Sequence, residues 1–219
     1  MKKKRETMVQ KKARADEVTA LLKRYYPNAE CALHHQNAYQ LLLATILSAQ
    51  CTDERVNMVT PYLFEQFPTP KELAQAKVEE IEQVIRSINF YRNKAKSLKA
   101  CAQSLVEHHG GEVPQTVEEL VELAGVGRKT ANVVLGVAFK IPSGIVVDTH
   151  VNRLSNRLAF VQAAEPEKIE IELQKIIDKP NWIEISHLLI THGRQICKAR
   201  NPQCEICFLN ELCPKIGVV

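Results

Sequence analysis

The chain has 219 residues, of which 45% are hydrophobic, 25% are charged and only 5% are aromatic. This composition excludes a disordered polymer and fits one compact domain, or two small ones, with an aliphatic core. The net charge of +4 is too small to establish a polyanionic partner by itself. The sequence has no apolar run near the roughly 20 residues that span a bilayer, and no apolar signal region follows its basic start. We therefore expect an intracellular protein.

Residues 1–14 form a basic N-terminal extension with a single acid, Glu6. Its basic residues are Lys2, Lys3, Lys4, Arg5, Lys11, Lys12 and Arg14. Such an arm can attract a polyanion. Charge alone, however, favours a solvated and frayed terminus.

The first half of the chain follows a helical pattern. Residues 38–50 are almost wholly apolar, which is typical of a buried helix. Thr52 can cap the next helix, because acids fill the first turn that follows it. Thr69 followed by Pro70 is a further helix start.

Two more helices follow, and a turn separates them. A short helix is predicted over residues 79–87, and Asn89 then stands where a left-handed residue would end it. Residues 93–109 predict a long helix that Gly110 and Gly111 stop.

The second half continues the helical pattern. Thr116 and Glu119 form a capping box before a short helix over residues 117–123, and a second helix follows over residues 128–139. Further helices are expected to begin at Asp148, at Pro166 and over residues 182–192. Residues 145–147 are the one strand candidate and are too short to build a sheet, so the fold class is all-α.

Two glycines join the helices on either side of the segment LAGVGRKTA (residues 123–131). Gly125 and Gly127 would expose backbone N–H groups at the start of the second helix, where the helix dipole favours an anion. With Arg128 beside them, this predicts a DNA phosphate contact that fixes position and reads no sequence. The alternative is a plain helix–turn–helix in which the glycines only permit the turn.

Lys129 lies in the first turn of the second helix, beside Arg128. The positive end of the helix dipole and the neighbouring cation both disfavour its ammonium form. A neutral amine is what a lysine nucleophile needs. From the local sequence alone, a surface lysine that touches phosphate is the simpler interpretation.

Asp148 begins the next helix, in the segment VDTHV (residues 147–151). Asp is among the best capping residues, so an N-cap is the first interpretation. A capping carboxylate that faces a cleft can also stabilise a cationic sugar or take a proton. Arg153 and Arg157 share the outward face of this helix and suit either phosphate contact or solvation. His150 suits either helix-start packing or a phosphate contact.

Four of the seven cysteines lie close together near the C-terminus, with the spacing C-x6-C-x2-C-x5-C. These are Cys197, Cys204, Cys207 and Cys213. Disulfides are uncommon inside cells, so the crowding indicates a metal site. Zinc usually takes two close pairs; the single close pair here favours a [4Fe–4S] cluster and leaves zinc open. A loop fixed at both ends to the metal would present Lys198 and Arg200 to DNA.

The remaining cysteines are scattered and suit buried or bystander positions. They are Cys31, Cys51 and Cys101.

In combination, these segments resemble the endonuclease III family of helix–hairpin–helix DNA glycosylase/AP lyases. The resemblance runs from about residue 17 to residue 213 and excludes the N-terminal extension. The order and separation of its segments carry it. These are LSAQCTD (residues 47–53), NKA (residues 93–95), the hairpin with Lys129, VDTHV and the cysteine spacing.

The resemblance implies two interleaved helical domains with DNA bound between them. One is a helical barrel over residues 31–143, with the helix–hairpin–helix at about residues 116–139. The other joins residues 15–30 to residues 144–219 and carries the cysteines. The resemblance also implies that the cysteine site holds a [4Fe–4S] cluster.

The resemblance assigns roles to single residues. Lys129 matches the Schiff-base lysine and Asp148 the catalytic aspartate. Gln50 matches the residue that fills the gap left by an extruded base, and Phe90 occupies the wedge position, where leucine is frequent. Ala124 stands where the hairpin commonly has proline, and Asn89 where glycine is common.

The implied function is base excision repair of double-stranded DNA with damaged pyrimidines or abasic sites. An oxidised pyrimidine would be removed through a lysine Schiff base, and β-elimination would break the strand on the 3′ side. We expect a monomer with no membrane association, in a prokaryotic cytoplasm and near the nucleoid.

Rival interpretations remain within and outside the family. Adenine-mismatch and thymine-mismatch glycosylases are disfavoured by Lys129, and the adenine enzymes usually carry a further C-terminal domain, which is not expected here because the chain ends just past the cysteines. A non-catalytic hairpin module would bind abasic DNA without cutting it. An iron–sulfur electron carrier would need no Gly-x-Gly-Arg-Lys element.

Overall fold

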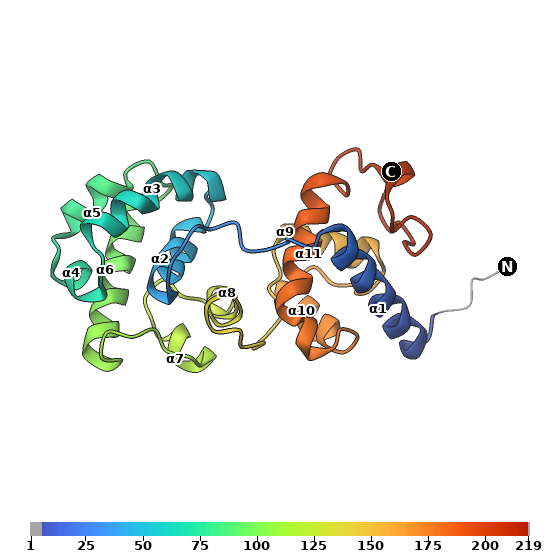
Figure 1. Ribbon diagram of the computed structural model, residues 1–219, viewed down its shortest axis with the longest axis horizontal. Coiled ribbons are helices and arrows are strands. Elements are labelled where there is room, and N and C mark those ends of the chain that lie inside the picture. The colour runs from blue at the N-terminus through green and yellow to red at the C-terminus, as the bar shows by residue number, and fades with distance from the viewer. Residues whose placement is uncertain (1–5, 219) are drawn as a thin grey trace. The chain divides into compact units, whose positions relative to one another are not determined.

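The computed structural model describes residues 6–218, and within them it contains eleven α-helices, two short 3-10 helices and no strand (Figure 1). This confirms the all-α class. No helix in the described part of the chain is long and apolar enough to cross a membrane. The chain divides into two compact units. We call Cys31–Ser143 the hairpin unit, and Met1–Glu30 with Gly144–Val219 the terminal unit.

The hairpin unit forms around α2, which is buried along almost its whole length because its sequence is apolar on every side. Helix α2 packs against α8, α6 and α3. Helix α3 starts at Thr52, whose hydroxyl accepts a hydrogen bond from Arg55 N (3.3 Å). The helices of this unit are α2 (Ala38–Ser48), α3 (Asp53–Gln66), α4 (Pro70–Gln75), α5 (Val78–Ile85), α6 (Tyr91–His108), α7 (Val117–Val121) and α8 (Arg128–Phe139).

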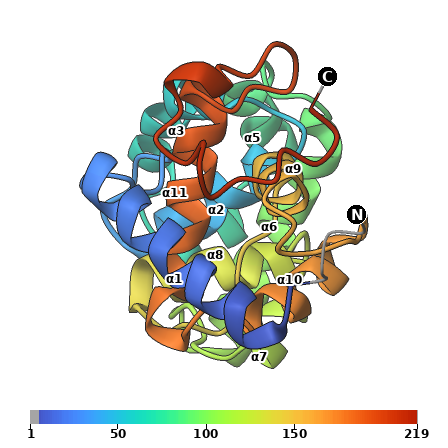
Figure 2. The same ribbon diagram turned by 90° about the vertical axis from the view of Figure 1, so that its right-hand side faces the viewer.

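The terminal unit joins the two ends of the chain around a separate core. Its helices are α1 (Met8–Tyr25), α9 (Thr149–Arg157), α10 (Pro166–Gln174) and α11 (Trp182–Gln195), with the 3-10 turns η1 (Lys179–Asn181) and η2 (Cys204–Ile206). Figures 1 and 2 show the blue helix α1 beside α11, which it contacts. Leu22, Val151 and Leu188 are fully buried in this core.

The prediction for Asn89 is wrong. The left-handed residue before α6 is Phe90, with a φ of 57°. The side-chain amide of Asn89 instead donates a hydrogen bond to the backbone oxygen of Gln50 (2.8 Å). This long-range bond fixes the local backbone, and it leaves no trace in the local sequence.

The prediction of a frayed N-terminus is wrong for the described part of the extension. Helix α1 begins at Met8 because Thr7 and Gln10 form a capping box. It continues inward because Ala15, Val18 and Leu22 lie on one face and are buried. The predicted residues Lys2, Lys3, Lys4 and Arg5 lie outside the described residues.

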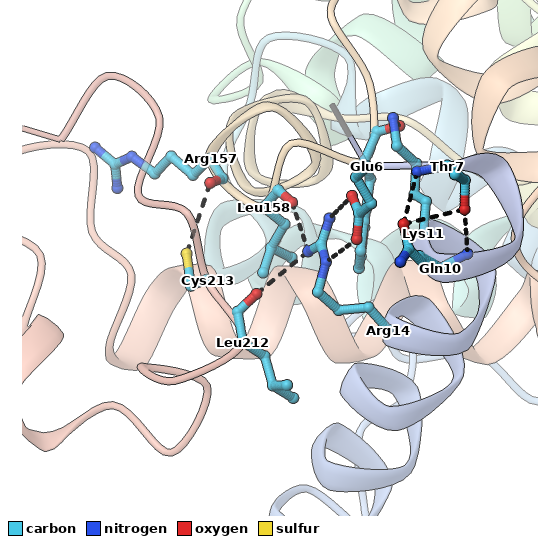
Figure 3. Close-up of polar contacts among 10 residues, drawn as sticks. Glu6, Thr7, Gln10, Lys11, Arg14, Arg157, Leu158, Leu212 and Cys213 are labelled. Carbon is cyan, nitrogen blue, oxygen red and sulfur yellow. Dashed lines mark hydrogen bonds and ion pairs between the residues drawn. The ribbon is translucent and has the colours of Figure 1, made fainter. Parts of the chain in front are cut away.

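Three basic side chains near the start of α1 bind to other protein atoms. Figure 3 shows Arg14 paired with Glu6 (2.8 Å) and donating to the backbone oxygens of Leu158 (2.8 Å) and Leu212 (3.2 Å). Lys11 donates to the oxygen of Phe160 (3.2 Å), and Lys12 pairs with Asp178. These contacts attach α1 to α9 and to the C-terminal loop.

Candidate active site and metal centre

The hairpin between α7 and α8 depends on a glycine at position 125. Thr116 caps α7 by accepting a hydrogen bond from Glu119 N (3.2 Å). Gly125 has a φ of 81°, and a Cβ atom placed there would lie 3.1 Å from Ser97 Cβ and 3.3 Å from Ile46 Cγ2. Both the left-handed backbone and the close approach to α2 and α6 therefore require glycine.

Gly127 has a different role from Gly125. Its φ of −99° and ψ of 174° are extended backbone that any residue adopts. A Cβ atom placed there would meet nothing within 4 Å, and the residue is exposed. The turn therefore does not need this glycine, but it leaves the N-terminus of α8 uncovered. That favours the phosphate interpretation over a glycine that only permits the turn.

Arg128 and Lys129 occupy the first turn of α8, and both side chains are exposed. Helix α8 ends at Phe139, as predicted, so the local signals of this element are strong. Lys129 thus combines access to an incoming ligand with a position at the positive end of a helix dipole.

Gln50 and Phe90 lie on two exposed turns of the hairpin unit. Phe90 is 62% exposed, and both residues are left-handed, with φ values of 54° and 57°. This conformation costs a residue other than glycine about 1–2 kcal/mol. Strain of this kind persists only where the surrounding structure holds it, and it concentrates at functional sites.

Lys94 provides part of that support, and the sequence did not indicate this role. The side chain is buried, and its Nζ donates to the backbone oxygens of Leu47 (2.8 Å) and Ala49 (2.6 Å) at the end of α2. Burial lowers the pKa of Lys94. The segment NKA (residues 93–95) was part of the resemblance, but the spacing of its residues carries no information about this contact.

Asp148 is the N-cap of α9, as predicted. Its Oδ1 accepts hydrogen bonds from His150 N and Val151 N, both at 2.8 Å. The residue is half-buried, and Oδ2 takes no part in this cap. Burial lowers the pKa of His150, whose Nδ1 lies 3.1 Å from Arg153 Nη2.

The outward orientation expected for Arg157 is wrong, because the residue is only 8% exposed. Its Nη1 donates to Lys198 O (2.7 Å) and Cys197 Sγ (3.3 Å), and its Nη2 donates to Ala199 O (3.0 Å). The carbonyl groups that follow α11 need donors, and a guanidinium offers five N–H groups in a fixed fork.

Arg153 binds the same region from one turn earlier on α9. Its Nη2 donates to the backbone oxygens of Gly193 and Cys197, each at 3.0 Å, and the residue is half-buried. The two arginines therefore connect the helix that Asp148 caps to the cysteine loop.

Gly193 is a structural residue that the sequence analysis missed. The helix predicted to end at His192 continues through Gly193 to Gln195. A Cβ atom at this position would lie 2.8 Å from His150 Nδ1 and 3.0 Å from Arg153 Nη2. A glycine inside a helical segment was the available signal for this close approach of α11 to α9.

The four clustered cysteines line one cavity of the terminal unit, together with Arg157 and His192. His192 Nε2 lies 3.4 Å from Cys207 Sγ. Among the described residues, no three Cys, His, Asp or Glu side chains are close enough to hold a single ion. The four sulfurs line a shared cavity, and a polynuclear cluster needs such a space between its thiolate ligands.

Burial disfavours the thiolate form of two of these cysteines when no metal is bound. Burial raises the pKa of Cys207 and that of Cys213. Binding iron favours the thiolate and offsets this effect. Lys198 and Arg200 are exposed on the loop between the first two cysteines, as expected for side chains that meet a ligand.

Comparisons with known proteins agree with this architecture. A model described as "HhH-GPD superfamily base excision DNA repair protein" matches residues 43–179, and one described as "Iron-sulfur binding domain of endonuclease III" matches residues 197–213. The chain is 53% identical over 207 residues to endonuclease III of Synechocystis sp., covering 94% of both. It is 46% identical to endonuclease III of Bacillus subtilis, covering 86% of both.

A solved structure described as a trapped endonuclease III–DNA covalent intermediate is also similar. It is 45% identical, has a TM-score of 0.88, and matches 93% of this chain and 96% of that one. The helical fold, the glycine hairpin and the cysteine cavity define a base-excision DNA repair protein of the helix–hairpin–helix superfamily. Within it, the chain belongs to the endonuclease III family. It is therefore a DNA glycosylase with AP lyase activity and carries an iron–sulfur cluster.

Proposed function

We propose that Lys129 is the nucleophile that removes oxidised pyrimidines from duplex DNA and cleaves the resulting abasic site. The observation that carries this assignment is its exposed position in the first turn of α8, next to an uncovered helix N-terminus suited to DNA phosphate. The covalent DNA intermediate of the 45% identical relative supports the covalent step.

The proposed reaction passes through a covalent bond between Lys129 and the sugar. The neutral Nζ of Lys129 attacks C1′ of the sugar, the N-glycosidic bond breaks, and the base leaves with a proton. Opening of the C1′–O4′ bond gives a Schiff base between Nζ and C1′. Loss of a C2′ proton expels the 3′ phosphate by β-elimination, and water finally releases the product from Lys129.

Asp148 is the second catalytic residue of this proposal. Its Oδ1 is engaged by two backbone N–H groups, which orient the carboxylate. Its Oδ2 stabilises the positive charge that develops on the sugar and assists proton transfer.

The remaining assigned residues bind and open the duplex. Gln50 and Phe90 fill the space that the extruded base leaves. Phosphate contacts come from the backbone and side chains of the hairpin, α9 and the cysteine loop. The residues assigned to these contacts are Gly125, Gly127, Arg128, His150, Arg153, Lys198 and Arg200.

The metal ligands of the proposal are the four cysteines around the cavity, and the group that they hold is a [4Fe–4S] cluster. Once bound, the cluster cross-links the loop that carries Lys198 and Arg200 to the rest of the terminal unit. We further infer that the enzyme acts as a monomer. The bacterial origin of its relatives supports a bacterial chromosome as its site of action.

Borohydride trapping on a thymine-glycol duplex tests the nucleophile. Borohydride reduces the Schiff base, so wild-type protein gives a covalent protein–DNA adduct, and Lys129→Ala gives none. Lys140→Ala is the matched control, because Lys140 is exposed at the other end of the same helix. An adduct that persists in Lys129→Ala would reject the assignment.

The Asp148→Asn variant tests the carboxylate separately from the cap. Asn also accepts N-cap hydrogen bonds, so the melting temperature stays near that of wild type. Single-turnover excision falls by about 100-fold or more, the scale of a lost acid–base group. Full excision activity in this variant would reduce Asp148 to a structural cap.

A further inference from the structure

Two exposed residues of the hairpin unit have a backbone conformation that is unfavourable for residues other than glycine. Gln50 follows α2, Phe90 precedes α6, and both have left-handed φ values. In an unconstrained loop, such residues would adopt φ and ψ values in the favoured regions. Something in the structure therefore holds the two turns.

Lys94 connects these turns from inside the unit. Its backbone N–H donates to Phe90 O (3.1 Å), and its Nζ donates to Leu47 O and Ala49 O (2.8 and 2.6 Å). The residue is only 8% exposed. Its cation lies at the C-terminus of α2, where the helix dipole and the unpaired carbonyls favour a positive charge.

Asn89 adds a second link beside the first. Its side-chain amide donates to the backbone oxygen of Gln50 (2.8 Å), and Asn89 is the residue directly before Phe90. Backbone oxygens at positions 47, 49 and 50 are thus bound by side chains from the segment that carries Phe90.

The linked turns rest on the same helices as the glycine hairpin. A Cβ atom placed at Gly125 would meet Ile46, in the last turn of α2, and Ser97, one turn beyond Lys94 on α6. A shift of α2 against α6 would therefore disturb the hairpin as well as the two turns.

We propose that Lys94, assisted by Asn89, is a positioning residue that holds Gln50 and Phe90 in a fixed relative orientation before DNA is bound. The inference rests on the proposed role of Gln50 and Phe90 in filling the opened base stack. Side chains that are already ordered lose less entropy on entering the duplex, so more of their contact energy goes into keeping the base extruded. Lys94 touches neither the substrate nor the reacting atoms.

The test compares a substrate whose processing requires an opened base stack to be filled with one that has no such stack. Single-turnover excision is measured on a thymine-glycol duplex, and strand cleavage is measured on an abasic site in single-stranded DNA. Lys94→Met and Asn89→Ala are expected to lower the duplex rate by about 10-fold, the effect of one or two lost hydrogen bonds. Cleavage of the single strand is expected to change by less than about twofold.

Three comparisons separate positioning from folding. Asn89 is exposed, so Asn89→Ala remains informative even if Lys94→Met fails to fold. Lys94→Arg keeps the cation and its donors and is expected to restore part of the duplex rate. Lys96→Met, an exposed site on α6 with the same loss of charge, controls for weaker DNA attraction.

A double-mutant cycle and a fluorescence signal complete the test. If Asn89 acts through Gln50, adding Asn89→Ala to Gln50→Ala lowers the duplex excision rate little further. A 2-aminopurine base opposite the lesion is expected to report less unstacking with Asn89→Ala than with wild type. Equal loss on both substrates, or fully additive effects, would overturn the positioning role.

Failure of the proposed stack-filling role can be distinguished from failure of the positioning role. If Gln50→Ala and Phe90→Ala both process the duplex at the wild-type rate, the proposed stack-filling role is wrong, and the positioning inference is overturned with it. If those two variants are impaired while Lys94→Met and Asn89→Ala are not, only the positioning inference is overturned.

Discussion

Gly125 and Gly127 lie two residues apart, but their backbone conformations and surroundings differ. Gly125 is left-handed and packs against Ser97 and Ile46, whereas Gly127 is extended and has open space around it. The fold requires the first glycine, whereas the second leaves the start of α8 uncovered.

Alanine at each position tests this division. Gly125→Ala is expected to lower the free energy of unfolding by about 2 kcal/mol, from the left-handed backbone and the tight contact. Gly127→Ala is expected to stay within about 0.5 kcal/mol of wild type while weakening binding to an abasic duplex. Urea unfolding and DNA titration measure the two effects, and a Gly127→Ala variant with unchanged affinity would contradict the phosphate assignment.

Because of Cys101, the stability of the hairpin unit is expected to fall at alkaline pH. Burial raises the pKa of this thiol from 9.0 to about 12. Above about pH 9 the unfolded chain loses this proton while the folded chain keeps it, so stability is complete below that pH and falls as pH rises towards 12. The total at stake is at most about 4 kcal/mol.

Urea unfolding at about pH 8 and about pH 10.5 checks the sign. Cys101→Ala is expected to be less stable at the lower pH because of the lost packing, but to lose about 2 kcal/mol less than wild type between the two. Identical losses in both proteins would show that Cys101 does not titrate differently on unfolding.

At the scale of elements, α1 is held to the terminal unit by polar contacts as well as by its apolar face. Arg14 reaches the carbonyl that follows α9 and the carbonyl that precedes Cys213 (Figure 3). Arg14→Met would leave those carbonyls and Glu6 without this donor.

We expect Arg14→Met to lower the free energy of unfolding by about 1–3 kcal/mol. Lys12→Met is the matched control on the same helix, because its ion pair with Asp178 is exposed and contributes about 0–1 kcal/mol. Chemical denaturation of the iron-loaded protein measures both. An Arg14→Met variant no less stable than Lys12→Met would show that α1 is held by its apolar face alone.

The helices could be predicted where their signals are local. Pro70, Pro166 and Asp148 start their helices as expected, because capping and the preferences of proline act within one turn. The left-handed turn at Phe90 and the burial of Arg157 could not, because each depends on partners far away in the chain.

The candidate site follows the same division. The cysteine spacing and the Gly-x-Gly turn are local patterns, and the sequence alone indicates a metal site and an anion site from them. Lys94 and Gly193 act through contacts with segments more than 40 residues away, at Leu47 and His150. Such contacts carry no spacing rule, so a single sequence does not reveal them.

At the scale of the whole molecule, the two units have separate cores. The four cysteines belong to the terminal unit, and their cavity is lined by residues of α9 and α11. Iron bound there stabilises that unit directly. The hairpin unit has no cysteine of this set and keeps its own core.

Removal of the cluster is therefore expected to affect the units unequally. After oxidative loss of iron, backbone amides of α9 and α11 should exchange hydrogen faster by about 10-fold or more, and those of α2 and α8 should change little. Hydrogen exchange followed by mass spectrometry resolves the two sets. Equal acceleration in both units would show that they unfold as one.

The terminal unit is assembled from both ends of the chain, and this has a consequence for synthesis on the ribosome. Helix α1 emerges first, with Ala15, Val18 and Leu22 uncovered, and must wait for α9 and α11. Residues 31–143 can meanwhile complete their core. A chain that stops before α9 would therefore leave the ribosome with a finished hairpin unit and a first helix without its partners.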